Sequence, residues 1–186
     1  MIIGITGSYC SGKDTLAEYL IQKGFAHLSL SDILRAEAAR RNLVADRETL
    51  IAIGNELREK HGPGVLAQLA LLHMNGSNHV VSSIRNPSEV KALRARSDFI
   101  LIALDAPQSI RWERMKQRKA LHNIATFEEF EQFENAEKSS DPNKQQLHLV
   151  INQADKIIVN AGTVKELNDA IDEIISAVHC SRQENA

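Results

Sequence analysis

Short apolar runs alternate along the chain with longer segments in which apolar residues recur at helical spacing. The short runs are almost continuously apolar, which is typical of parallel strands buried on both faces. Their alternation with helices predicts a parallel sheet that helices cover on both sides. The predicted strands are Ile2–Thr6, Phe25–Leu30, His79–Ile84, Phe99–Leu104 and Lys156–Asn160.

The longer segments predict helices, several of which carry capping signals. Ser31 or Asp32 can cap the second helix, and Pro87 stands where the first turn of a helix tolerates proline. Thr163 followed by Glu166 forms a capping box. The predicted helices are Lys13–Gln22, Ser31–Arg41, Arg47–Glu59, Gly64–Met74, Ser88–Ala95, Pro107–Lys119, Thr126–Lys138, Asn143–Gln153 and Val164–Val178.

One predicted helix carries phenylalanines at a spacing of three, namely Phe127, Phe130 and Phe133. On a helix this spacing favours a stripe that faces the core, whereas a surface for stacking bases is the less common alternative. We therefore expect these rings to be packed inside the protein.

Length and charge narrow the class of protein. At 186 residues the chain has the length of one domain, and its net charge of -2 offers no positive field for nucleic acid. The apolar start Met1–Gly7 lacks a basic lead, so it predicts a strand rather than a signal peptide, and no apolar run could span a membrane. Cys10 and Cys180 form no metal or disulfide pattern. We expect a cytoplasmic monomer or homodimer that binds neither nucleic acid nor membrane.

The first strand runs directly into a glycine-rich turn, Gly7-Ser8-Tyr9-Cys10-Ser11-Gly12-Lys13, which fits G-x-x-x-x-G-K and precedes a helix. In such a loop, backbone N–H groups and the positive pole of the helix surround a phosphate, and the lysine supplies a full charge. The turn predicts ATP binding. The predicted contacts are Gly7, Ser8, Ser11, Gly12, Lys13, Asp14 and Thr15.

The predicted metal site departs from the usual pattern. Asp14 stands where the motif asks for Ser or Thr, and the third strand ends in Ser82 where an acidic residue is common. A carboxylate is a hard oxygen ligand that suits Mg²⁺. We hypothesise that Asp14 replaces the strand-end acid, while the alternative is that it only favours the first turn of a helix.

Several segments resemble known nucleotide kinases. Gly7–Thr15 resembles the P-loop of phage-type deoxynucleoside monophosphate kinases, and His27–Arg35 is similar to the G-D-x-L-R stretch of adenylate kinases, with Ser31 in place of the glycine. The resemblance implies a three-layer α/β/α P-loop NTPase fold with a five-stranded parallel sheet and a helical lid. It implies that Arg35 grips the acceptor's phosphate and that Asp32 orients or deprotonates the accepting oxygen, although Asp32 could equally be an N-cap.

Two further segments resemble acceptor sites. Gly54–Gly64 is similar to the acceptor-binding insert of deoxynucleotide kinases, which implies Arg58 and Asn55 as acceptor contacts. An ordinary solvated arginine is the alternative for Arg58. Arg85 follows the third strand, at the sheet edge where functional residues gather, and it corresponds to an arginine of adenylate kinases that suits phosphate.

Arg111, Arg114 and Arg118 lie at offsets of three and four, on one face of a helix. They resemble the lid arginines of monophosphate kinases, which stabilise charge on the transferring group and exclude water. The alternative is ordinary surface pairing, for which Glu113 and Lys116 are available.

The segment Ala154–Thr163 is similar to a loop of dephospho-CoA kinases that borders adenine, which implies cofactor contacts from Asn160 and Gly162. The resemblances together predict a single domain over 1–186, with an acceptor-binding insert at about 36–76 and a lid at about 107–142. We expect an ATP- and Mg²⁺-dependent kinase of a (deoxy)nucleoside monophosphate. A dephospho-CoA kinase and a non-catalytic ATP-binding module are the alternatives.

Overall fold

The five predicted strands form one all-parallel sheet in the order β2-β3-β1-β4-β5. A computed structural model describes residues 1–76, 78–117 and 124–183. The chain passes from β1 in the middle of the sheet to the edge strand β2, and returns through β3 before it crosses to β4 and β5. The strands are β1 (Ile2–Gly7), β2 (Ala26–Ser29), β3 (His79–Ser82), β4 (Phe99–Asp105) and β5 (Lys156–Val159).

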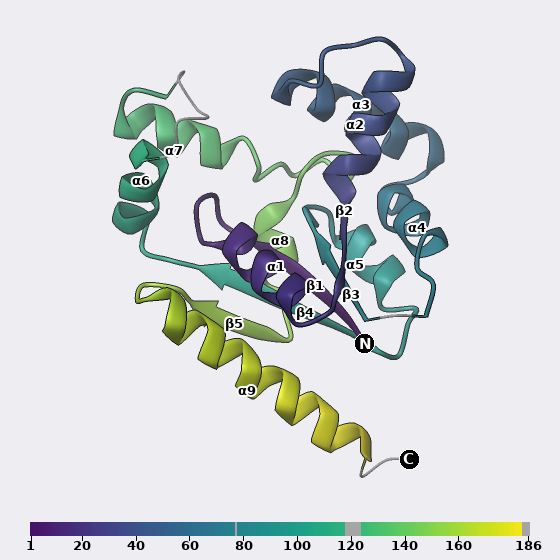
Figure 1. The fold of residues 1–186 in the computed structure, drawn as a ribbon. Coiled ribbons are helices and arrows are strands. Elements are labelled where there is room, and N and C mark those ends of the chain that lie inside the picture. Colours follow the sequence, from purple (N-terminus) through teal and green to yellow (C-terminus); the bar gives the residue numbers. More distant parts are fainter. Residues whose placement is uncertain (77, 118–123, 184–186) are drawn as a thin grey trace.

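Nine helices surround the sheet in the described part of the chain. They are α1 (Lys13–Gln22), α2 (Leu30–Arg40), α3 (Arg47–His61), α4 (Val65–Leu72), α5 (Pro87–Leu93), α6 (Gln108–Gln117), α7 (Phe127–Asn135), α8 (Leu147–Ile151) and α9 (Val164–Gln183). α1 and α9 cover one face and α4, α5 and α8 the other, so the predicted three-layer α/β/α fold is confirmed (Figure 1). No helix in these ranges is long and apolar enough to cross a membrane.

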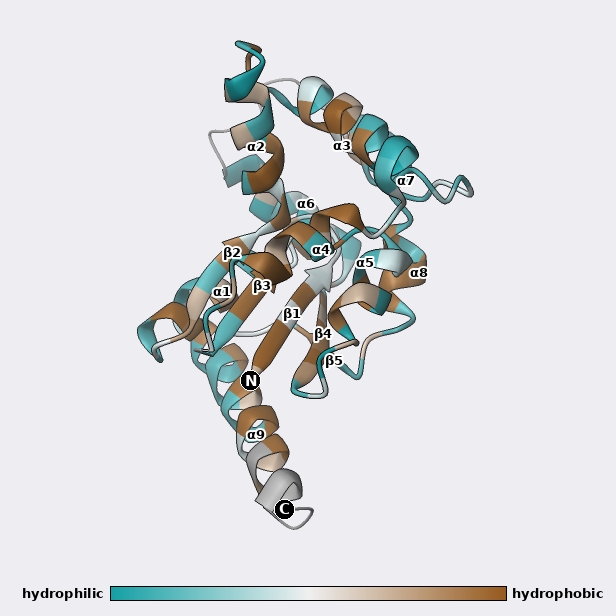
Figure 2. Cartoon of the chain, turned by 90° about the vertical axis from the view of Figure 1, so that its right-hand side faces the viewer, coloured by the Kyte–Doolittle hydropathy of each residue, from teal (hydrophilic) through white to brown (hydrophobic). Residues whose placement is uncertain are grey.

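The core has two main clusters, one on each face of the sheet. Alternate residues of β1 separate them, because Ile2 joins the cluster with α2 to α5, whereas Ile3 and Ile5 join the cluster with α1 and α9. Figure 2 shows β1 as an almost uniformly hydrophobic strand. This burial on both faces explains why the strand is a continuous apolar run in the sequence.

Two helical projections stand at the carboxyl-terminal edge of the sheet (Figure 1). The pair α2–α3 follows β2, and the pair α6–α7 follows β4. A third, smaller hydrophobic core supports the pair α6–α7. In this core Phe130 is fully buried against Cys10 and Met115. The prediction of a core-facing phenylalanine stripe is therefore confirmed at Phe130, while Phe127 packs at its margin.

Two local predictions are wrong. α2 is capped by Ser29, whose hydroxyl accepts from the backbone N–H of Ser31 at 3.3 Å, so neither Ser31 nor Asp32 is the cap. α8 spans only five residues instead of Asn143–Gln153. Before it, the carboxylate of Asp141 accepts from the N–H of Asn143 in a turn that competes with a helix start.

Other local signals are confirmed. Pro87 is the first residue of α5, which Asn86 caps. Thr163 and Glu166 exchange the two hydrogen bonds of a capping box, with distances of 2.6 and 3.2 Å. These devices fix the starts of two helices that follow carboxyl ends of strands.

Candidate functional site

The turn between β1 and α1 has the closed shape of a phosphate-binding loop. Gly7 and Gly12 have φ angles of +136° and +104°, a region that favours glycine. A Cβ atom at Gly7 would collide with the carbonyl oxygen of Leu104, and one at Gly12 with the side-chain nitrogen of Asn160. Gly7 is therefore required by the close approach of the backbone of β4, and Gly12 by its positive φ angle.

Lys13 lies at the start of α1 and folds back over the loop. Its ammonium group donates to the carbonyl oxygens of Gly7 and Ser8, at 2.9 and 2.6 Å. The pKa of Lys13 is lowered from 10.5 to about 8, chiefly by burial and then by the nearby charge of Arg85, while the carboxylate of Glu137 opposes this shift. A cation held this way favours an anionic ligand, which would restore its charge.

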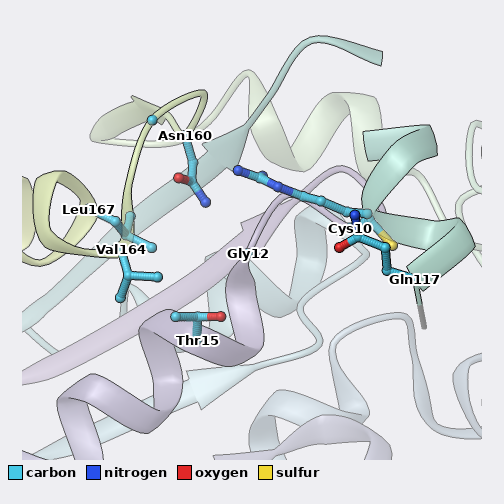
Figure 3. A pocket seen from close by; sticks show the side chains of 9 residues that line it. Cys10, Gly12, Thr15, Gln117, Asn160, Val164 and Leu167 are labelled. Atoms are coloured by element: carbon cyan, nitrogen blue, oxygen red, sulfur yellow. The ribbon is translucent and has the colours of Figure 1, made fainter. Parts of the chain in front are cut away.

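Asn160 connects the loop after β5 to the phosphate-binding loop. Its side-chain amide donates to the carbonyl oxygen of Ser11 at 2.8 Å, and its backbone N–H donates to the carbonyl oxygen of Asp105 at 2.7 Å. The side chain is 8% exposed. Figure 3 shows Asn160 directed toward Gly12 across the cleft from Cys10 and Gln117. The sequence predicted Asn160 as a cofactor contact, which stays a prediction, and in the structure its side chain holds the phosphate-binding loop.

A cleft of about 290 Å³ opens beside the loop. Its size is near the lower end of the range that small-molecule sites span, roughly 300 Å³ upward. Five predicted residues line it, namely Gly12, Thr15, Asn160, Gly162 and Arg114 of α6. In the described part of the chain, the Nη1 atom of Arg114 is buried and has no hydrogen-bond partner. A guanidinium nitrogen that has no partner beside a phosphate-binding loop can donate a hydrogen bond to a phosphate oxygen of a nucleoside triphosphate.

The three predicted lid arginines have different positions. Arg114 lines the cleft, whereas Arg111 is buried against Glu134 of α7 and donates to the carbonyl oxygen of Ala106 at 2.8 Å. Burial lowers the pKa of Arg111, and the carboxylate of Asp105 opposes this. Arg118 lies outside the described residues. On the surface of α6, the ammonium group of Lys116 and the carboxylate of Glu113 form an ion pair of 2.7 Å, which is the surface pairing that the alternative expects.

Arg85, directly after β3, approaches the phosphate-binding loop from the other side. Arg85 and Lys13 line one small cavity together with Glu137, whose carboxylate lies 3.8 Å from the Nε atom of Arg85. Glu137 also forms an ion pair of 3.0 Å with Arg47 at the start of α3. Sequence reasoning missed Glu137 and Arg47 because 90 residues separate them and neither belongs to a motif.

The predicted acceptor residues do not form one group. Asp32 and Arg35 form an exposed ion pair of 2.6 Å on α2, and among the described residues no hydrogen bond or ion pair joins them to the phosphate-binding loop. Asn55 lines a separate cleft with Arg47 and Glu137, where its Oδ1 atom is buried without a partner in the described ranges.

Arg58 is buried in an ion pair with Glu89 of α5. The two side chains are 4% and 0% exposed and 3.0 Å apart, so the alternative of a solvated surface arginine is wrong. The other oxygen of Glu89 accepts from the backbone N–H groups of Arg85 and Asn86, at 2.9 and 3.0 Å. In this structure Arg58 therefore supports the loop that carries Arg85, and the predicted contact with an acceptor has no support from its position.

The metal side of the site offers few protein ligands. In the described ranges, no three His, Cys, Asp or Glu side chains gather into a metal site. Mg²⁺ commonly binds through one or two carboxylates, water and substrate phosphates, so Asp14 and Thr15 at the start of α1 fit this mode. The last residue of β3 is Ser82 instead of an acid, and its hydroxyl forms a hydrogen bond of 2.8 Å with His27.

A second carboxylate at the loop was missed by sequence reasoning. Asp105 ends β4 and accepts from the hydroxyl of Ser8 at 2.9 Å. The signal was available, because polar residues at carboxyl ends of parallel strands line ligand sites, and Asp105 directly follows the apolar run of the fourth strand.

The sequence of the chain is similar to those of known proteins. The family described as "AAA domain" matches residues 3–137. The chain is 31% identical to a UPF0200 protein of Thermococcus kodakarensis, over 95% of this chain and 99% of that protein. It is 32% identical to a UPF0200/UPF0201 protein of Archaeoglobus fulgidus over 94% of this chain, and it spans about half, 54%, of that longer relative.

Solved structures share the fold. The protein TT1252 from Thermus thermophilus superposes with a TM-score of 0.62 and 22% identity, covering 95% of this chain and 97% of that one. Shikimate kinase from Aquifex aeolicus gives a TM-score of 0.54 and 16% identity, covering 95% and 97%. At these identities the similarity establishes a P-loop kinase-like fold and nothing about the substrate.

Proposed function

Since the chain belongs to the AAA domain family and is a relative of the UPF0200 proteins, we propose that it is an ATP-dependent phosphotransferase. Its acceptor is a small nucleotide, most simply a (deoxy)nucleoside monophosphate. The observation that carries this proposal is the cleft beside the P-loop, which Gly12 and Thr15 line together with Arg114, whose buried Nη1 atom has no hydrogen-bond partner in the described residues. Lys13 belongs to the same loop and lines a separate small cavity with Arg85. Fold alone would not support it, because similar folds serve many functions.

Different residues of the site have different roles in phosphoryl transfer. Backbone N–H groups from Gly7 to Lys13 hold the β-phosphate of ATP, and Lys13 neutralises charge on the γ-phosphoryl group. Arg114 stabilises the charge that spreads over the transferring oxygens. The bond between the γ-phosphorus and the bridging oxygen breaks and ADP leaves, while a new bond forms to an oxygen of the acceptor's phosphate, which is mostly deprotonated at neutral pH and needs no base. Asn160 and Gly162 border the adenine.

Mg²⁺, held by Asp14, by the hydroxyl of Thr15 and by the phosphates, would neutralise charge on the triphosphate. We expect Asp14→Ala to raise the Mg²⁺ concentration needed for half-maximal turnover by about tenfold, the effect of losing roughly 1.4 kcal/mol of binding. A magnesium titration of turnover measures this. Glu18→Ala, on the same helix, is the matched control. An unchanged magnesium requirement in Asp14→Ala, together with loss in Asp105→Asn, would instead assign the metal to the end of β4.

The acceptor is proposed to bind between the insert at about 36–76 and the lid at about 107–142. Arg85 lies beside Lys13 and provides a phosphate contact, while Asp32 and Arg35 would need the α2–α3 projection to move toward the P-loop. Asp32 would then orient the accepting oxygen. Dephospho-CoA is the second candidate acceptor, favoured by the resemblance of Ala154–Thr163 to a loop of dephospho-CoA kinases.

The test is ADP release from ATP and Mg²⁺ across a panel of ribo- and deoxyribonucleoside monophosphates and dephospho-CoA, with Lys13→Ala as the control. Release that one acceptor stimulates, and that the Lys13→Ala variant loses, supports the proposal and identifies the substrate class. Tight ATP binding with acceptor-independent background throughout would support the alternative of a non-catalytic ATP-binding module.

A further inference from the structure

A single buried carboxylate lies among three cations where the two helical projections approach the P-loop. The side chain of Glu137 is 4% exposed, although a buried carboxylate is costly unless it is paired. Its partners are Arg47 at 3.0 Å and Arg85 at 3.8 Å, and Lys13 lines the same small cavity as Arg85 and Glu137. Three positive charges against one negative charge leave this cluster with a positive excess, which favours an additional anion.

Glu137 also lines a second cleft, of about 120 Å³, on the side of α3. Water in the liquid occupies about 30 Å³ per molecule, so the cleft has room for a group of phosphate size. Arg47, Asn55, Phe133 and Lys144 contribute to its lining. The cleft and the cavity at Lys13 share Glu137, so an anion in the cleft would lie next to the P-loop, as a phosphorylated acceptor requires.

The polar groups of the cleft are prepared for a ligand. The guanidinium group of Arg47 lies 3.6 Å from the ring of Phe133, which holds it in place. The side chain of Arg47 is 36% exposed, so it can still reach a ligand. In the described part of the chain, the buried Oδ1 atom of Asn55 lacks a hydrogen-bond donor, a cost that a hydroxyl or a protonated ligand atom would remove.

We propose that Arg47 and Arg85 bind the phosphate group already present on the acceptor, and that Glu137 is an internal counter-ion that holds these arginines until that phosphate replaces it. This inference rests on the proposed function and specifies the acceptor as a phosphate monoester. A dianionic phosphate presents more charge and more acceptor oxygens to two guanidinium groups than one carboxylate does. Acceptors with no phosphate would not displace Glu137.

Two variants that remove opposite charges from one ion pair should change the affinity for phosphate in opposite directions. In Glu137→Gln the arginines lose their competitor, so affinity for a phosphate anion rises. In Arg47→Gln the site loses a cation, so affinity falls. A purely structural ion pair predicts no such opposition, because both variants would damage the site in the same direction.

The experiment is calorimetric titration of inorganic phosphate into the protein while a non-hydrolysable ATP analogue with Mg²⁺ saturates the P-loop. We expect Arg47→Gln to weaken phosphate binding by about tenfold or more, Arg47→Lys to have an intermediate affinity, and Glu137→Gln to bind at least about threefold more tightly than the wild-type chain. Arg96→Gln, which removes an exposed arginine paired with Asp98, is the matched control and should bind as the wild type does.

Equal phosphate affinity in Arg47→Gln and the control, or unchanged or weaker binding in Glu137→Gln, overturns the inference. Thermal unfolding of each variant checks that it is folded before titration. Since binding of phosphate requires no turnover, the expected affinities can be found even if no acceptor is phosphorylated, which would overturn only the proposed kinase activity. Conversely, turnover of an acceptor without phosphate overturns this inference and leaves the kinase activity standing.

Discussion

At the scale of single residues, the ionisation of Lys13 gives a test of the nucleotide site. In the protein without ligand, its pKa is lowered to about 8, so above pH 8 a growing fraction of molecules carries a neutral Lys13. A bound triphosphate favours the charged form and raises this pKa again. Binding above pH 8 therefore takes up a proton, and ATP affinity falls as the pH increases beyond 8.

Titration with a non-hydrolysable ATP analogue at pH 9, in two buffers of different ionisation enthalpy, measures this uptake. We expect different apparent heats at pH 9 and a smaller difference at pH 7.5, where Lys13 is mostly charged before binding. Equal heats in the two buffers at pH 9 would argue against Lys13 as the residue that contacts the triphosphate.

Asn160 gives a second test at this scale, because one amide joins the β5–α9 loop to the P-loop. We expect Asn160→Ala to lower the free energy of unfolding by about 1–2 kcal/mol, since it leaves the carbonyl oxygen of Ser11 without its partner. The KM for ATP should rise more than kcat falls. Urea denaturation and steady-state kinetics measure these effects. Asn152→Ala, an exposed amide at the end of α8, should change neither.

The residue-level predictions from the sequence succeed where a motif fixes both the backbone and the chemistry. The spacing of Gly7, Gly12 and Lys13 predicts a loop whose shape the structure confirms. Glu137 and Arg47 could not be predicted in this way, because their contact depends on how α3 and the segment after α7 meet in space. For Arg58 the resemblance implied an acceptor contact, which stays a prediction, while its burial in an ion pair with Glu89 was not predicted from the sequence.

At the scale of elements, the ion pair of Arg58 and Glu89 joins α3 to α5 and supports the loop after β3. We expect Arg58→Met to lower the free energy of unfolding by about 3–5 kcal/mol, because it leaves the fully buried carboxylate of Glu89 uncompensated. Replacing both residues, as in Arg58→Met with Glu89→Gln, should recover a large part of this loss.

Chemical denaturation measures both variants against Arg94→Met. That control breaks a partly exposed pair with Asp155, which should cost no more than about 1 kcal/mol. A loss in Arg58→Met as small as in this control would show that the carboxylate of Glu89 finds another partner or reaches water.

The elements themselves were predictable to different degrees. All five strands lie where apolar runs predict them. Burial on both faces explains the runs of β1 and β4, whereas the edge strands β2 and β5 are largely exposed, so the prediction of burial on both faces is wrong for these two. Helix ends were less certain, since α2 begins at Leu30 under a cap by Ser29, and the turn at Asp141 delays α8. Side-chain hydrogen bonds to the backbone decide these ends, and apolar periodicity does not report them.

At the scale of the whole molecule, the proposed activity needs the α6–α7 projection to respond to nucleotide. Trp112, the single tryptophan of the chain, lies on α6 with its ring 5.6 Å from Phe130 and 5.9 Å from Phe127. Arg114 on the same helix lines the nucleotide cleft, so a ligand that binds Arg114 should shift the packing around Trp112.

We therefore expect a change in tryptophan fluorescence when a non-hydrolysable ATP analogue is added to the wild-type chain. Lys13→Ala should lose the change at the same analogue concentration, and Arg114→Gln should require more analogue. An emission spectrum that does not respond to saturating analogue, with binding verified by calorimetry, would contradict a lid on α6 and α7.

The central claim is phosphoryl transfer to a nucleotide, and the most direct test follows the γ-phosphate itself. Incubation with γ-labelled ATP, Mg²⁺ and the acceptor that most stimulates ADP release should place the label on that acceptor in proportion to the ADP formed. Lys13→Ala should transfer none. Label recovered only as inorganic phosphate, in both the presence and the absence of every acceptor, would contradict the claim and identify the chain as a hydrolase or an ATP-binding module.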